Sequence, residues 1–177
     1  MKKLIASVLV GLIFCAVANA EPQTFISVND FNRDFNTVSY LIGSGHIINS
    51  DNINFETGTV RDYFVITFAN GVIILHVYMP HIENYTGEMN DINEIDLLFS
   101  SDGTTESAAH LAIAIGELAY TTGAISDIQD IGAFADQLGF LQNVYDGASN
   151  TLTINGLNYS YSISSVFGFH FSITKAD

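Results

Sequence analysis

Hydrophobic residues between positions 29 and 42 recur every three or four residues, which is the spacing of one face of an α-helix. The residues on this face are Phe31, Phe35, Val38 and Ile42. Ser27 and Asp30 are spaced as a capping box at the amino end, and Gly43 suits the carboxyl end. The pattern therefore predicts an amphipathic helix over residues 29–42.

From Val60 to Met79 the pattern changes to alternation, which is typical of strands with one buried face. Asn70-Gly71 at its centre favours a tight hairpin turn, because both residues tolerate positive φ. The apolar pairs that this turn predicts are Phe68 with Ile73, Ile66 with Leu75, and Phe64 with Val77. The opposite face receives Arg61, Tyr63, Val65, Ile74, His76 and Tyr78.

A second hairpin is expected to turn at Asn155-Gly156, between strands over 151–154 and 157–164. Its apolar face consists of Leu152, Ile154, Leu157, Tyr159, Tyr161 and Ile163. A last strand follows, with Phe167, Phe169, Phe171 and Ile173 facing inward. Alternation with one polar face is typical of antiparallel sheets that are solvated on one side.

A strand near 95–99 and two further helices are expected between the hairpins. The first helix, over 104–121, should bury Ala108, Leu111, Ala112, Ile115 and Leu118. Its Gly116 would allow a neighbouring element to approach closely. The second helix should begin with a capping box at Ser126 and end before Gly139. Its apolar stripe is Ile128, Ile131, Phe134, Ala135 and Leu138.

Every predicted element has one apolar face that must be covered by another element. Helices packed on one face of a sheet satisfy this requirement for all of them. The expected fold is therefore α+β, with an antiparallel sheet of about five to six strands in a two-layer sandwich.

The first twenty residues have the pattern of a secretory signal peptide. Lys2 and Lys3 precede an apolar run that closes on the small-residue site Ala18-Asn19-Ala20. Cleavage there would leave residues 21–177, a length expected to form a single domain, exported to the periplasm or secreted. It would also remove Cys15, the chain's one cysteine, so packing without disulfides must stabilise the mature protein.

The charge of the chain is strongly acidic and changes which partners are plausible. Five basic residues stand against nineteen acidic ones, and the signal peptide contains two of the five. Nucleic acid is excluded as a partner by repulsion between phosphates and such a surface. No apolar segment beyond the signal peptide is long enough to predict membrane insertion. A basic protein would be attracted by this charge.

Recognisable catalytic motifs are absent from the sequence. It contains no Gly-x-Ser-x-Gly elbow, no His-Glu-x-x-His, no phosphate-binding glycine loop and no dinucleotide fingerprint. No cofactor is therefore expected, and a protein without enzymatic activity is favoured. A hydrolase stays open as an alternative, with His76 or His170 acting beside a carboxylate. Catalytic carboxylates that come together from distant positions in the chain form no recognisable sequence motif.

Glu106, His110 and Glu117 form the sharpest local cluster that suggests a metal. At about 100° per residue the three side chains lie on one side of the predicted helix. Imidazole and carboxylate are ligands for Zn²⁺ or Mn²⁺. No second His or Cys stands at ligand spacing, so we interpret the cluster as a solvated helix face and predict no metal site.

If no helix and no part of the acidic loop over 80–93 covers it, the second face of the first hairpin is the best candidate for a binding surface. Tyrosine and arginine are enriched at protein interfaces, and here they stand together with an imidazole. The candidate residues are Arg61, Tyr63, Val65, His76 and Tyr78. We therefore predict a module that binds a basic partner, such as an inhibitor or immunity-type protein of an envelope or secreted protein. The alternative is a carrier of a small hydrophobic ligand, held between the sheet and the helices.

Overall fold

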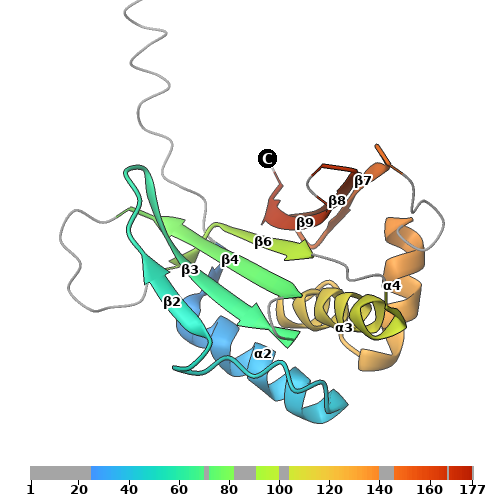
Figure 1. Ribbon diagram of the computed structural model, residues 1–177, viewed down its shortest axis with the longest axis horizontal. Coiled ribbons are helices and arrows are strands. Elements are labelled where there is room, and N and C mark those ends of the chain that lie inside the picture. Colours follow the sequence, from blue (N-terminus) through green and yellow to red (C-terminus); the bar gives the residue numbers. More distant parts are fainter. Residues whose placement is uncertain are drawn as a thin grey trace, which may run out of the picture.

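The computed structural model describes residues 25–69, 72–81, 91–99, 104–139, 146–166 and 168–176. They form two layers, a sheet and a group of helices that cover one of its faces (Figure 1). The predicted signal peptide, the Asn70-Gly71 turn and Phe167 lie outside the described residues. The α+β fold expected from the sequence is confirmed.

Seven strands form the main sheet, in the order β2-β3-β4-β6-β9-β8-β7, and every neighbouring pair is antiparallel. The strands are β2 (Ile53–Glu56), β3 (Arg61–Phe68), β4 (Ile73–Pro80), β6 (Glu94–Phe99), β7 (Ser149–Ile154), β8 (Leu157–Ser164) and β9 (Gly168–Lys175). Two short strands, β1 (Ile26–Ser27) and β5 (Asp91–Ile92), pair separately.

The sheet has more strands than the five to six expected, because the edge strand β2 was not predicted. Three of its four residues are exposed, so it shows no alternation between buried and exposed positions. Hydrogen bonding to β3, in the register Ile53 to Ile66, brings this segment into the sheet. A strand of this kind depends on its neighbour and leaves no periodic signal of its own.

Both predicted hairpin registers are confirmed. Phe68 lies opposite Ile73 in the first hairpin, and Ile154 lies opposite Leu157 in the second. Asn155 and Gly156 have φ of 51° and 78°, the positive values that the tight turn requires. The paired strands β6 and β9 lie between the two hairpins in the sheet.

Helix α2 (Val28–Ile42) begins and ends where the sequence predicted. The Ser27 hydroxyl accepts a hydrogen bond from the Asp30 backbone N–H at 3.0 Å. Gly43 ends the helix in the left-handed conformation, with φ of 68°. Phe31 and Phe35 are fully buried, so the predicted amphipathic face is the one that meets the core.

The predicted buried face of helix α3 (Thr105–Thr121) is confirmed only in part. Leu111, Ile115 and Leu118 are buried as expected, but Ala108 and Ala112 are exposed. The reason is that α2 packs alongside α3, which turns the buried stripe toward Ala114 and Glu117.

The second predicted helix is divided into a 3-10 turn, η2 (Ile128–Asp130), and a short helix, α4 (Ile131–Leu138). Asp127 caps η2 by accepting from the Gln129 N–H, so the cap predicted at Ser126 was wrong by one residue. The prediction for Gly116 is confirmed. A Cβ at that position would lie 2.6 Å from the Ile131 side chain, so the glycine lets α4 pack directly on α3.

Candidate functional site

The sheet face opposite the helices presents the candidate residues predicted from the first hairpin. Alternate residues of β3 and β4 point into the core and are buried, and the residues between them are partly exposed. Arg61, Tyr63, Val65, His76 and Tyr78 all belong to this second set. No helix of the described part of the chain packs on this face, which we call the open face (Figure 1).

Strand pairing arranges the open face into rows that cross the sheet. One row runs Glu56, Tyr63, Tyr78, Glu94, Thr174, Asn158 and Thr153. The next runs Asn54, Val65, His76, Asp96, Ser172, Ser160 and Thr151. The aromatic, imidazole and carboxylate groups therefore gather on β3, β4 and β6, and hydroxyl and amide groups occupy β7 and β8.

Aromatic contacts hold the first half of this face together. The ring centroids of Tyr63 and Tyr78 lie 5.4 Å apart, and His76 meets Tyr78 edge-on at 5.9 Å. Arg61 lies over the Tyr78 ring, 3.8 Å from its centroid, and forms an ion pair with Glu94. We call Arg61, Tyr63, Val65, His76, Tyr78, Glu94 and Asp96 the aromatic-acidic patch.

Asp96 stands between two histidines of the open face. It lies opposite His76 in the β4–β6 register, and its Oδ1 is 3.1 Å from His170 Nε2. The polar contact with Asp96 raises the pKa of His170, and the charges of Asp96 and Glu94 act in the same direction against partial burial. Burial lowers the pKa of His76, a shift that Asp96 opposes and His170 reinforces. The two imidazoles therefore differ in their affinity for a proton.

We expect NMR titration to find the His170 midpoint above the ordinary value of 6.5 and the His76 midpoint below it. By linkage, His170 stabilises the fold fully below pH 6.5, and this contribution is lost as the pH rises through its raised pKa. His76 acts in reverse, since its contribution is complete above pH 6.5 and is lost as the pH falls through its lowered pKa.

The Asp96→Asn substitution should move both midpoints down, because the carboxylate raises the pKa of each imidazole. Glu94→Gln serves as the control and should move only His170, by a smaller amount. Equal midpoints for the two histidines in the wild-type protein would contradict the assigned pairing of Asp96 with His170.

The hydroxyl half of the open face satisfies much of its own hydrogen bonding. Thr151 and Ser160 share a hydrogen bond of 2.8 Å across β7 and β8. The Thr153 hydroxyl donates to the Asn158 amide oxygen at 2.7 Å. On the open face, β7 and β8 present no aromatic and no charged side chain. The aromatic and charged groups of this face are therefore concentrated in the aromatic-acidic patch.

The Glu106, His110 and Glu117 cluster is not the solvated helix face that the sequence indicated. Glu106 is exposed, but Glu117 is fully buried on the side of α3 that meets α2. Glu117 Oε2 lies 2.7 Å from His46 Nδ1, and His46 Nε2 lies 2.8 Å from His110 Nδ1. A carboxylate and two imidazoles thus form a chain from the interior toward the surface.

Two serine hydroxyls complete the surroundings of the buried carboxylate. Ser39 donates to Glu117 Oε1 at 2.8 Å, and Ser44 donates to the same oxygen. A carboxylate only accepts hydrogen bonds, so His46 must carry its hydrogen on Nδ1. In the neutral form of His46, Nε2 is then the acceptor for His110 Nδ1–H. We call Ser39, Ser44, His46, His110 and Glu117 the buried relay.

His46 was not among the residues singled out from the sequence. It follows α2 in a loop and stacks against Phe68 at 5.3 Å, where it is almost completely buried. It stands 71 residues from Glu117, so no spacing rule could have paired them. Within the described residues, no group of three or more His, Cys, Asp or Glu side chains is arranged to hold a metal ion.

Comparisons with models of known protein families, with curated proteins and with solved structures found no match to this chain. Among the helices that the structure describes, none combines the length and the apolar character needed to span a membrane. The function must therefore be argued from the chemistry of the open face and of the helical layer.

Proposed function

We propose that the chain is an exported protein-binding module that docks a basic partner on its aromatic-acidic patch. The observation that carries the proposal is the position of Tyr63 and Tyr78, side by side on a sheet face that no described helix covers. Tyrosine at such a position supplies a large amphipathic contact surface at low entropic cost.

The charge of the patch favours lysine and arginine on the partner. Asp96 contributes a carboxylate, Glu56 lies exposed at the edge beside Tyr63, and Glu94 offsets the charge of Arg61 through their ion pair. The net charge of −14 on the chain extends the same field over a longer range. Such a field accelerates encounter with a basic protein and is weakened by salt.

The signal-peptide pattern over residues 1–20 supports the exported part of the proposal. An inhibitor or immunity-type protein of an envelope or secreted partner would combine export, acidity and an aromatic docking surface. A partner of this kind presents a cationic site that the patch would cover.

Truncation of Tyr78 tests the proposal. The immobilised protein is exposed to envelope extract at low salt, and captured basic proteins are identified and their affinity is measured. Tyr78→Ala should weaken the complex by about 2 kcal/mol or more, mainly through faster dissociation. Tyr40→Ala is the matched control, since Tyr40 is 82% exposed on α2 in the helical layer and should not alter binding. Equal affinities of the two variants would refute the patch as the docking site.

Neutralising Glu56 distinguishes long-range electrostatic attraction, which affects the association rate, from direct contact, which affects the dissociation rate. Glu56→Gln should slow association and reduce its dependence on salt, with little change in the dissociation rate, because an exposed charge at the edge acts through a screened field. Surface plasmon resonance at several salt concentrations provides both rates. A change confined to dissociation would show that Glu56 is a direct contact instead.

A further inference from the structure

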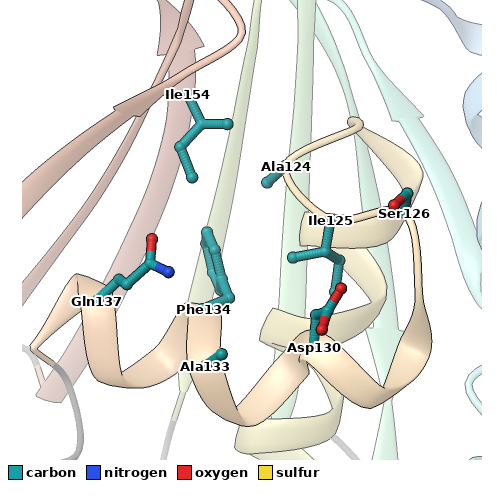
Figure 2. Close-up of a pocket in the computed structure, with 8 residues that line it drawn as sticks. All are labelled: Ala124, Ile125, Ser126, Asp130, Ala133, Phe134, Gln137 and Ile154. Atoms are coloured by element: carbon teal, nitrogen blue, oxygen red, sulfur yellow. The ribbon is translucent and has the colours of Figure 1, made fainter.

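A pocket of about 340 Å³ lies at the β7 edge of the helical layer, far along the sheet from the aromatic-acidic patch. It is bounded by α4, by the segment 124–126 and by the tip of the second hairpin (Figure 2). Its volume is in the range of small-molecule sites. The patch and the pocket share no residue, so the pocket is independent of the proposed function.

Both apolar and polar side chains line the pocket. Phe134, Ile125 and Ile154 surround the central space, and Asp130 and Gln137 stand on either side of Phe134 (Figure 2). Ser126 adds a hydroxyl on the segment 124–126. The hydrogen bonds of the described residues include none from the side chains of these three polar residues, so their acceptors are available to a ligand.

The walls of the pocket are fixed by contacts outside it. The Phe134 ring packs edge-on against the buried Tyr159, with centroids 5.5 Å apart. The Asn155 side chain at the hairpin tip donates to the Gly123 carbonyl at 2.8 Å, which ties the hairpin to the segment before 124–126. Asn150 binds the last turn of α4 through the Leu138 carbonyl. A ligand would therefore meet a pocket that is already formed, which reduces the entropic cost of binding.

The charge of the lining selects one ligand class. Asp130 is the one ionisable residue among those that line the pocket, and no lysine or arginine is present there. The Asp130 carboxylate can accept hydrogen bonds from an ammonium group, and Gln137 and Ser126 add uncharged polar groups to the lining. We infer that this pocket binds a small primary amine, with the ammonium at Asp130 and an apolar chain against Phe134 and Ile154.

Three probes with the same alkyl chain test the inference: n-hexylamine, n-hexanol and hexanoate. Each is titrated into the ¹⁵N-labelled protein, and shifts of the backbone amides around Phe134 and Ile154 are followed. We expect the amine to bind about fivefold more tightly than the alcohol, the size of effect that a partly exposed ion pair provides. Hexanoate should bind most weakly, because its carboxylate is repelled by Asp130.

Asp130→Asn should remove the preference of the amine over the alcohol. Asp130 makes no side-chain cap to α4, so this change should leave the helix intact. Glu106→Gln is the control for loss of one negative charge outside the pocket and should keep the preference. Ala133→Leu should weaken all three probes by filling the pocket. An unchanged preference in Asp130→Asn would overturn the amine assignment, and probe-induced shifts confined to other regions would overturn the site.

Discussion

The Glu117→Ala variant is expected to lose about 3 to 5 kcal/mol of unfolding free energy, because each buried donor left without an acceptor costs roughly 1 to 3 kcal/mol. The substitution leaves the buried His46 N–H and two serine hydroxyls without the acceptor that all three share. Glu117 is fully buried and His46 is 2% exposed, so water cannot replace the lost carboxylate without opening the contact between α2 and α3.

Thermal denaturation measures this effect and should show a melting temperature lower by on the order of 10 °C. Glu106→Ala on the exposed side of the same helix is the control and should change stability by less than about 0.5 kcal/mol. If the two variants melt together, the buried relay contributes nothing to stability.

A second variant separates the charge of Glu117 from its shape. In Glu117→Gln the amide NH₂ faces His46 Nδ1 when its oxygen keeps the two serine contacts. His46 then has to accept at Nδ1 and carry its hydrogen on Nε2, which reverses the direction of donation toward His110. Nitrogen NMR of the imidazoles reports this change of tautomer. We expect the cost in stability to be smaller than that of the alanine variant, because no buried donor is left unpaired.

Truncation of Phe171 to alanine is expected to cost about 3 to 5 kcal/mol, a large share of the stability of a domain of this size. Phe171 is fully buried on β9, between Leu97 of β6 and Tyr161 of β8. It therefore belongs to the junction of the two halves of the sheet. Removal of its ring leaves a cavity that the paired strands on both sides cannot close.

The matched control removes the same side chain at the edge of the sheet. Phe55 on β2 is 40% exposed, so Phe55→Ala should cost about 1 kcal/mol. Denaturant unfolding of both variants gives the comparison. A Phe171→Ala variant as stable as Phe55→Ala would show that the face of β9 has been assigned wrongly. The predicted core positions Phe64, Ile66 and Phe169 are buried as well.

The two large effects probe different parts of the molecule. Phe171 tests the packing of the sheet, and Glu117 tests the polar contact between α2 and α3. Neither residue lies in the aromatic-acidic patch or in the pocket beside α4. Their variants therefore measure stability separately from the two proposed binding activities.

The local alternation of β3 and β4 predicts which residues of these strands lie on the patch. It does not predict which residues of other strands lie beside them. A period of two along β3 and β4 is enough to put Tyr63, His76 and Tyr78 on one face. Their contact with Glu94 and Asp96 requires the β4–β6 pairing, and the contact of Asp96 with His170 requires β9 as well. These pairings join segments that are distant in the chain.

By itself the sequence determined the elements whose signals are local. The Ser27 cap and Gly43 defined α2, and Asn155-Gly156 defined the second hairpin, because capping and turn geometry depend on a few adjacent residues. The alternation in β3 and β4 determined which face is buried. These features were predicted with their register.

Only the tertiary structure decided the rest. The packing of α2 on α3 buried Glu117 and brought it to His46, where the sequence had indicated a solvated face. The edge strand β2 formed because β3 offered it free hydrogen-bonding groups, and α4 packed close to α3 because Gly116 left room for Ile131. In each case the deciding contact joins residues far apart in sequence. Helical periodicity and strand alternation show which face of an element is apolar, but not which distant element will pack on that face.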